Sequence, residues 1–197
     1  LVLLTAQQLH TAASLLDLAE VLDELEVKLV FGGMIFNSSS RIRGNFPGTF
    51  LGEKLENVVS NVEFELNKPQ EIFRASINNR SYLMKKFRSE LPGIENRIRE
   101  LLPEYSQRYQ TPTRYLSRDI AAALRLDDIT LLSGDIDWVS GLLVYAKVPE
   151  SALIEFLQIY QKAVYDILGK DAETILTWLQ NEIERLNEKL GIKIAGT

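Results

Sequence analysis

The chain has 197 residues, enough for one large or two small domains, and 46% hydrophobic with 25% charged residues is typical of a folded globular protein. Its net charge of −5 gives it no overall attraction for nucleic acids or anionic membranes, and no apolar stretch reaches the roughly 18 residues that span a bilayer. Because the chain has no cysteine, it has no disulfides, thiolate nucleophiles or thiolate metal sites, which suits a cytoplasmic protein.

The first third of the sequence predicts alternating strands and helices. Two short apolar runs, residues 1–4 and 28–31, predict strands, and the apolar residues between them recur at helical spacing as far as Glu26, with Thr5 as the expected helix cap. Strands joined by a helix of this length should run parallel, with a right-handed crossover. Because two strands cannot form a stable sheet alone, we expect the chain to be a piece of a longer protein that lacks its amino-terminal part.

The second strand ends in a pair of glycines, Gly32 and Gly33. In open α/β sheets ligands bind at the carboxyl ends of the strands, and a backbone without Cβ atoms allows a ligand to approach closely. We therefore predict that Thr5 and the two glycines share one edge of the sheet. The alternative is a tight turn that binds nothing. A loop is predicted for residues 37–48, and a further helix is marked by Leu51, Leu55, Val58 or Val59, and Val62.

From Asn67 onward the sequence predicts helices only. Their expected ranges are 72–88, 94–102, 115–126, 138–145, 151–168 and 172–190. The boundaries between them are marked by Pro92-Gly93, Pro103, Pro112, Pro149 and Gly169. The last two helices carry sustained apolar stripes and together predict an antiparallel bundle. The predicted fold is thus α/β plus all-α, with an α/β domain over residues 1–66 and a helical domain over 67–197.

Charge is distributed unevenly along the chain. Residues 1–66 carry a net charge of −5, residues 67–126 carry +6 and residues 127–197 carry −6. The basic side chains Arg74, Arg80, Lys85, Lys86 and Arg88 lie close in sequence. They could bind a phosphate or an acidic surface, but the chain is negative overall and aromatics do not interleave with them. We favour the alternative that this basic stretch faces acidic segments of its own chain or of a second copy.

Catalytic and metal sites have little support in the sequence. His10 is the one histidine, and no residue pattern supplies the orienting partner that a nucleophilic site needs. The acidic pairs Asp127-Asp128 and Asp135-x-Asp137 lack the glycine and glutamate of a calcium loop and are expected to cap helices. Phosphate-binding and nucleophile-elbow motifs do not occur. We therefore expect no enzyme, no catalytic residue and no metal ligand.

Three short motifs resemble the later half of a cobalamin (vitamin B12)-binding domain of the flavodoxin-like type. Thr5-Ala6-Gln7 stands where that family has Ser-x-Leu, with Thr replacing Ser and Gln replacing Leu. Gly32-Gly33 matches the family's Gly-Gly. The sequence Gly48-Thr49-Phe50-Leu51-Gly52 resembles the versions that are attached to MerR-type bacterial transcription regulators. The resemblance covers about a third of the chain.

The resemblance implies a cofactor site. In the family the hydroxyl and the glycines line the slot for the nucleotide tail of cobalamin, so Thr5, Gln7, Gly32 and Gly33 are the candidate cofactor-binding residues. The family's cobalt-binding Asp-x-His-x-x-Gly motif lies earlier, in the half that this chain lacks, and His10 does not match it. We therefore predict that cobalamin binds the full-length protein and that the 197 residues alone do not bind it tightly.

The preferred function is the sensory or dimerising part of a bacterial transcription regulator, working by ligand-shifted packing between its two parts. DNA would be bound by a missing amino-terminal part, and a homo-oligomer would form through helices 151–168 and 172–190. The alternatives are a corrinoid-carrying subunit of a methyltransferase or mutase, and a helical interaction module whose α/β part binds nothing.

Overall fold

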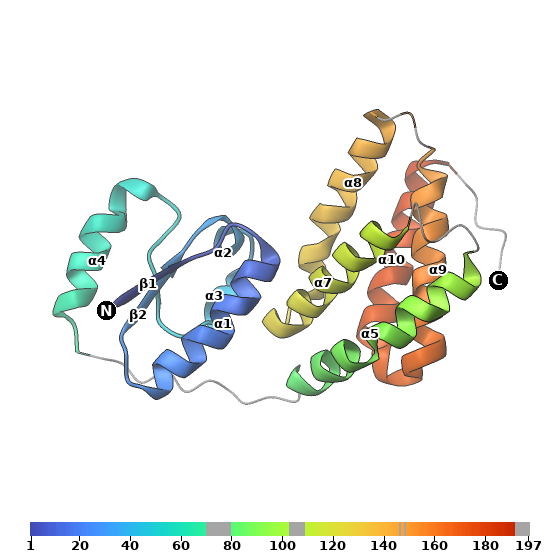
Figure 1. The fold of residues 1–197 in the computed structure, drawn as a ribbon. Helices are drawn as coiled ribbons and strands as arrows, with labels where there is room; N and C mark the ends of the chain where they lie inside the picture. Colours follow the sequence, from blue (N-terminus) through green and yellow to red (C-terminus); the bar gives the residue numbers. More distant parts are fainter. Residues whose placement is uncertain (70–79, 103–108, 146, 148, 192–197) are drawn as a thin grey trace. The chain divides into compact units, whose positions relative to one another are not determined.

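A computed structural model describes the chain except for residues 70–79, 103–108, 146, 148 and 192–197, and it divides into two compact units (Figure 1). The first unit comprises Leu1–Arg80 and Ala122–Leu131, and the second comprises Ser81–Ala121 and Leu132–Thr197. The predicted combination of a small parallel sheet with a helical part is confirmed. The first unit differs from the predicted domain of residues 1–66 because it also takes in a segment from the helical part of the sequence.

The first unit is built on a three-stranded parallel sheet. Strands β1 (Val2–Thr5), β2 (Leu29–Gly32) and β3 (Thr49–Phe50) lie in the order β1-β2-β3. Thr5 is the register partner of Gly32, so both strands end at the same edge, as predicted. The third strand was not predicted, because two residues are too few to show a periodic pattern.

The helices of the first unit differ from the predictions in three places. They are α1 (Leu9–Glu24), α2 (Met34–Ser38), α3 (Ser40–Asn45), the 3₁₀ turn η1 (Leu55–Asn57) and α4 (Val58–Asn67). One difference is at Leu51, which was expected to mark the last helix but follows β3 and donates its N–H to the Phe31 carbonyl, so that the helix begins only at Val58. Thr5 does not cap α1; it belongs to β1, and Gln8 precedes the helix without a side-chain cap. The predicted loop over residues 37–48 is largely helical, because the hydroxyl of Ser39 accepts the Ile42 N–H at 3.3 Å and caps α3.

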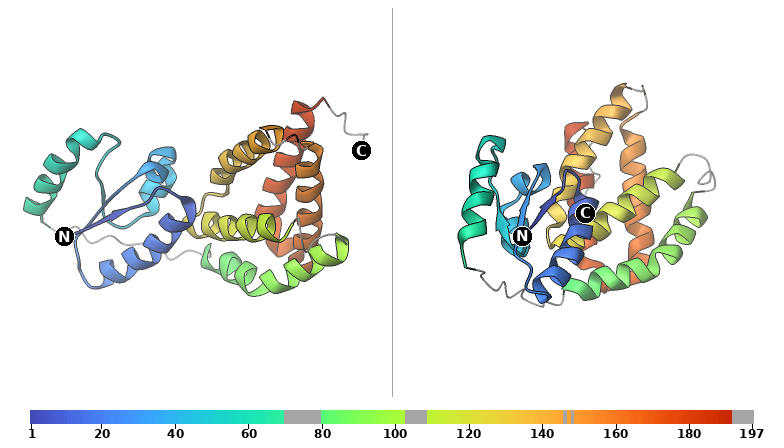
Figure 2. Two further views of the ribbon diagram at one scale, coloured as in Figure 1. Left: turned by 45° about the horizontal axis from the view of Figure 1, so that its top comes forward. Right: turned by 60° about the vertical axis from the view of Figure 1, so that its left-hand side comes forward.

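The two faces of the sheet are covered by different helices. Right-handed crossovers in the order β1-β2-β3 put α1, α2 and α3 on one face, and Figures 1 and 2 show α4 across the sheet from them. On the first face the ring of Phe31 lies 4.8 Å from that of Phe36 and 4.7 Å from that of Phe46. On the second face Asn61 of α4 donates to the Leu51 carbonyl at 2.7 Å.

Helices make up the rest of the described chain. They are α5 (Arg80–Leu101), α7 (Gln110–Leu126), η2 (Ile129–Leu132), α8 (Ser133–Tyr145), α9 (Ser151–Leu168), η3 (Gly169–Ala172) and α10 (Glu173–Lys189). The predicted bounds of α9 are confirmed, and residues 72–79 of one predicted helix and the boundary at Pro103 lie outside the described residues. None of the described helices is long and apolar enough to cross a membrane.

Two prolines that the sequence predicts as helix boundaries lie inside helices, so these two predictions are wrong. Pro92 lies inside α5, because the buried side chains Phe87, Ile94 and Ile98 continue the same packed face on both sides of it. Pro112 lies in the first turn of α7, where a helix needs no amide donor. Buried contacts on both sides of Pro92 therefore outweigh its tendency to end a helix, and Pro112 stands where this tendency does not act.

The apolar stripes of α9 and α10 pack against each other and are not exposed. Leu157 and Leu179, which stand in the middle of the two stripes, are both fully buried, and α9 and α10 are neighbours in the second unit. Tyr160 shares a buried hydrogen bond of 2.7 Å with Ser117 of α7. The prediction that these two stripes mediate self-association is therefore wrong: they form the core of one chain's own bundle.

One member of the predicted basic stretch, Lys86, meets an acidic residue of the same chain, as the favoured alternative expects, whereas Arg74 lies outside the described residues. In the second unit Lys86 pairs with Asp171, and Arg97 pairs with Asp166 at 2.8 Å. These ion pairs are partly exposed to solvent and contribute little free energy each, but they account for part of the charge asymmetry.

Glu65 of α4 is a buried carboxylate that bonds a strand of the sheet in the first unit. It is 7% exposed and accepts hydrogen bonds from Lys68 at 2.7 Å and from Thr49 at 3.1 Å. The hydrogen bond from Lys68 is the main cause that lowers the pKa of Glu65, against the effect of burial. Glu65 thereby ties α4 to β3.

We predict that Leu157→Ala lowers the free energy of unfolding by about 2–5 kcal/mol, because it leaves a cavity in the bundle core. Tyr165→Ala on the same helix is the matched control; Tyr165 is 59% exposed, and its loss should cost less than about 1 kcal/mol. Urea unfolding followed by circular dichroism measures both. Equal effects, or a halved solution mass at unchanged stability, would contradict the packing described above.

We predict that Glu65→Gln costs about 1–2 kcal/mol at neutral pH, because it removes a charge-assisted hydrogen bond. Since the pKa is lowered in the folded state, the stabilisation is complete above the unfolded pKa of about 4.3 and is lost as the pH falls through the folded value. Unfolding titrations at several pH values should show wild type and Glu65→Gln converging in acid. The exposed neighbour Glu63 supplies the control, and a Glu63→Gln variant with the same convergence would refute the assignment.

Candidate functional site

The candidate site lies where β1 and β2 end. Thr5 and Gly32 are neighbours in the parallel register, so their side-chain positions point to the same face of the sheet. Thr5 is exposed, whereas Gly32 is buried. A Cβ atom built on Gly32 would meet nothing within 4 Å, so a small open space adjoins this glycine. The hydroxyl of Thr5 and the bare backbone of Gly32 therefore border a space that a ligand could enter.

Gly33 has a reason for being glycine that involves no ligand. Its φ is +115°, and a Cβ atom there would lie 2.1 Å from the carbonyl oxygen of Ala6. The Ala6 N–H in turn donates to the Gly32 carbonyl at 3.1 Å, so the chain after β1 and the chain after β2 lie in close backbone contact here. Gly33 is required by the fold.

Gln7 likewise has a structural partner. Its side-chain oxygen accepts the N–H of Met34 at 3.3 Å, at the first residue of α2. It thus links the chain after β1 to the helix after β2. The structure brings all four predicted residues to one edge, but Gln7 and Gly33 have structural roles, and Thr5 and Gly32 remain as the pair with free space beside them.

The segment Ala122–Leu131 belongs to the first unit, and we call it the docked segment. Its residue Asp128 accepts a hydrogen bond from Ser39 at 2.8 Å, and Asp127 pairs with Arg41 at the same distance. Ser39 follows directly on α2, which itself begins after the two glycines. The docked segment is thus bonded to the part of the chain that leads away from the candidate site.

A second attachment joins the docked segment to α1. Arg125 is only 16% exposed in its side chain and contacts Asp17 at 2.6 Å and Glu20 at 2.5 Å. Asp128 also accepts from the Thr130 hydroxyl at 2.6 Å, which confirms its predicted capping role at η2. Sequence reasoning missed these contacts, because partners separated by more than 80 residues leave no local pattern.

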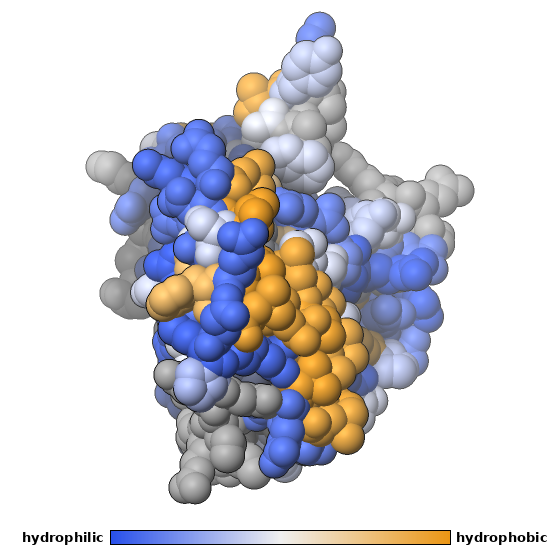
Figure 3. Space-filling model, turned by 90° about the vertical axis from the view of Figure 1, so that its left-hand side faces the viewer, coloured by the Kyte–Doolittle hydropathy of each residue, from blue (hydrophilic) through white to orange (hydrophobic). Residues whose placement is uncertain are grey.

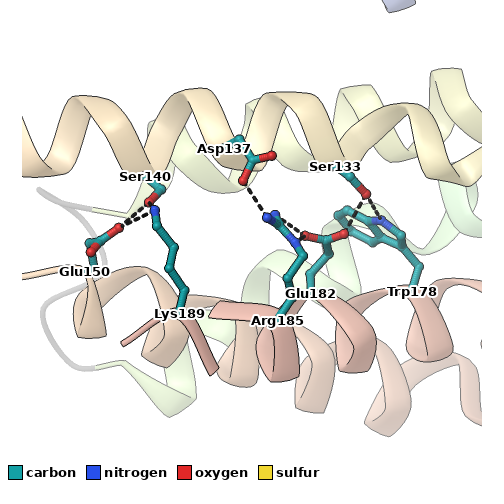
Figure 4. A network of polar contacts seen from close by, with 8 residues as sticks. All are labelled: Ser133, Asp137, Ser140, Glu150, Trp178, Glu182, Arg185 and Lys189. Atoms are coloured by element: carbon teal, nitrogen blue, oxygen red, sulfur yellow. Dashed lines mark hydrogen bonds and ion pairs between the residues drawn. The ribbon is translucent and has the colours of Figure 1, made fainter. Parts of the chain in front are cut away.

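The second unit contains a polar network between α8 and α10 (Figure 4). Glu182, which is 5% exposed, accepts from Ser133 at 2.5 Å and from Arg185, and Arg185 also reaches Asp137 at 2.6 Å. Asp137 therefore lies within α8 as an ion-pair partner and does not cap the helix before Trp138.

The same network continues toward the start of α9. Glu150 accepts from Ser140 and from Lys189, the latter at 3.0 Å, and these two hydrogen bonds lower the pKa of Glu150. Trp178 donates to Ser133 at 3.5 Å. Because the charged members contact partners of opposite charge, the network fastens α8 to α10.

No protein-family model matches the chain, and no curated protein matches it. Among the described residues, no three or more histidine and acidic side chains gather into a group that could hold a metal ion. The groups that the candidate site presents are the hydroxyl of Thr5 and the bare backbone of Gly32 at the sheet edge.

We predict that alanine at the two glycines changes the free energy of unfolding by very different amounts. Gly33→Ala should lower the free energy of unfolding by more than about 3 kcal/mol, because it combines a positive φ with a backbone clash. Gly32→Ala should change it by less than about 1 kcal/mol, because its Cβ enters open space. Urea unfolding of both variants is the measurement. A well-tolerated Gly33→Ala would mean that Gly33 does not lie against the Ala6 carbonyl as described.

Proposed function

We propose that this chain is the sensory part of a bacterial transcription regulator, and that its first unit is the second half of a flavodoxin-like, cobalamin-binding-like domain. The single observation that supports this most is the docked segment: residues from the helical part of the sequence are hydrogen-bonded to the chain that follows the glycine edge. A ligand at that edge could thus alter how the docked segment packs.

Thr5 and Gly32 fit the nucleotide tail of cobalamin in this proposal. The Thr5 hydroxyl can donate to or accept from a phosphate or sugar oxygen, and the space beside Gly32 admits a flat or bulky group. Bound cobalamin would serve as a signal that is recognised, rather than as a reactant. The cobalt of cobalamin would be bound by residues that do not belong to this sequence of 197 residues.

Transmission would follow α7. This helix contributes its last residues to the first unit and its earlier residues to the second, where Ser117 bonds Tyr160. A ligand that binds one packing of the docked segment more tightly than another shifts the equilibrium between the two packings. The size of the shift is set by the difference in affinity. The complete protein would act as a homo-oligomer and bind DNA through an amino-terminal part.

A helical interaction module that binds no cofactor is the second candidate. It is supported by the structural roles of Gln7 and Gly33, which explain half of the predicted site residues without a ligand. The two candidates differ in how they explain Gly32. Neither a backbone clash nor a positive φ requires a glycine at this position.

We predict that the complete gene product binds hydroxocobalamin at micromolar concentration and gives a bound-state absorption spectrum, whereas residues 1–197 alone bind at least about tenfold more weakly. Gly32→Leu should abolish the change by filling the open space. Gly44→Leu is the matched control, because Gly44 is an exposed glycine of α3 that also has no atom within 4 Å of its Cβ position.

Two outcomes would contradict the proposal. One is a complete gene product whose spectrum does not change at saturating cobalamin, which leaves the interaction module. The other is binding that Gly32→Leu and Gly44→Leu weaken equally, which would place the ligand elsewhere.

A further inference from the structure

Helix α8 is covered by its own chain on one face and exposed on the other. Ile136 and Ser140 are buried, and Figure 4 shows Ser133 and Ser140 of α8 turned toward α10. On the opposite face Trp138 is 66% exposed and Tyr145 is 89% exposed. Large aromatic side chains on an exposed helix face are typical of protein interfaces, where they supply most of the binding energy.

This exposed face alternates glycines with the aromatic residues. Gly134, Trp138, Gly141 and Tyr145 are spaced by four, three and four residues, which keeps them on one side of the helix, and we call them the α8 face. A Cβ atom built on either glycine would meet nothing within 4 Å, so open space lies beside each exposed ring. Glycine is unfavourable inside a helix, and neither a positive φ nor a clash within the chain requires these two.

The order of residues on the α8 face is complementary to itself in an antiparallel pairing. The midpoint between Trp138 and Gly141 is also the midpoint between Gly134 and Tyr145. A two-fold axis at this point therefore sets Trp138 of each copy opposite Gly141 of the other, and Tyr145 opposite Gly134. Each ring then enters the space that a glycine leaves open, as in knobs-into-holes packing, and the glycines allow the two backbones to approach closely.

We propose that the α8 face binds the same face of a second copy of this chain, as an antiparallel helix pair about a two-fold axis. A parallel pairing would instead set ring against ring and glycine against glycine. The inference goes beyond the proposed function, because the pairing requires no ligand at the sheet edge of the first unit.

Charges at the two ends of the α8 face favour the same orientation. Asp135 lies at its amino-terminal end and Lys147 just beyond its carboxyl-terminal end. Within the described part of the chain neither forms an ion pair, since the nearby Arg118 pairs with Asp119 at 2.8 Å. The antiparallel pairing brings Lys147 of each copy close to Asp135 of the other. Opposite charges at the border of an interface favour one register over others.

The area of the α8 face suits a weak dimer. A buried aromatic side chain removes about 150–250 Å² from solvent, so the exposed parts of Trp138 and Tyr145 amount to roughly 300 Å² in each copy and roughly 600 Å² in a pair. Val144, which is 59% exposed, adds to this area. Stable interfaces bury about 1,200–2,000 Å² in total, so the dimer should form reversibly at high protein concentration.

The uncovered apolar face of the first unit is less suited to a second copy. Leu1 and Leu3 at β1 are 44% and 48% exposed, Val59 and Leu66 of α4 are 69% and 57% exposed, and Figure 3 shows a continuous hydrophobic area on the side of the molecule that carries α4 and β1. Neither β1 nor α4 contains a glycine, so neither offers a gap that an opposing ring could fill. This face supplies the control for the test.

Sedimentation equilibrium of the 197-residue chain measures the dimer. We expect a Kd of about 100 µM or tighter, and Trp138→Ala and Gly141→Leu should each weaken it at least about tenfold. Gly141→Leu should leave Tm unchanged or raise it, because leucine is the better helix former and has open space within the monomer. Val59→Glu on the uncovered apolar face and Gly44→Leu, at an exposed helical glycine of α3, should leave the Kd unchanged.

Cross-linking measures the orientation of the pair, because the chain has no cysteine of its own. A mixture of the Gly134→Cys and Tyr145→Cys chains should form a disulfide-linked dimer on mild oxidation. Either variant alone should not, since in the antiparallel pair its two cysteines would lie about 16 Å apart along the helix axis, beyond the reach of a disulfide.

Three results would overturn the proposal. The first is a chain that stays monomeric at about 500 µM, well above the expected Kd. The second is a dimer that Val59→Glu weakens as much as Trp138→Ala does, which would place the interface on the first unit. The third is cross-linking of either cysteine variant alone, which would indicate a parallel pair. A failure of cobalamin to bind would change none of these outcomes, so the two proposals are tested separately.

Discussion

The parallel pairing of β1 with β2 is the constraint on which the rest of the first unit depends. It sets Thr5 beside Gly32, forces Gly33 against the Ala6 carbonyl, and leaves Gln7 within reach of the first turn of α2. A shift of one residue would turn Leu3 toward α1 and Leu4 outward, and would take the Thr5 hydroxyl from the face that Gly32 leaves open. The candidate site and the uncovered apolar face are thus two consequences of one register.

The docked segment gives this sheet edge a connection to the helical part. Arg125, Asp127 and Asp128 hold it to α1 and to the start of α3 through partners of opposite charge or hydroxyl groups. Exposed pairs such as Arg41–Asp127 contribute little stability, whereas Arg125 is largely buried and would be costly to leave unpaired. Polar attachments of this kind are suited to exchange between two arrangements, because their geometry is specific and their net free energy is small.

The sequence was sufficient to predict helices and strands where the hydrophobic pattern is local and repeated. The alternation of short apolar runs with a helix predicted β1, α1 and β2, and the stripe that includes Leu157 and Tyr160 predicted the bounds of α9. It was insufficient where packing across the chain decides. Pro92 stays within α5 because buried residues on both sides of it share one face, and β3 exists because Gly48 to Leu51 are held against β2.

The candidate site shows the same division. The glycine pair indicated the edge, but only coordinates distinguish Gly33, which the backbone requires, from Gly32, which it does not. The docked segment could not have been predicted, since Ser39 and Asp128 are 89 residues apart. Self-association through the α9 and α10 stripes was a reasonable inference from periodicity, but periodicity does not say whether an apolar face meets its own chain or another.

We propose that ligand binding at the β1–β2 edge changes the packing of the docked segment. Hydrogen exchange of residues 122–131 in the complete protein, measured with and without saturating hydroxocobalamin, tests this most directly. We predict that protection of these amides changes about tenfold or more on binding, and that Ser39→Ala, which removes the hydrogen bond to Asp128, reduces this change and shifts the affinity for the ligand with it, because coupling between two sites is reciprocal. Bound cobalamin with unchanged exchange across residues 122–131 would contradict it.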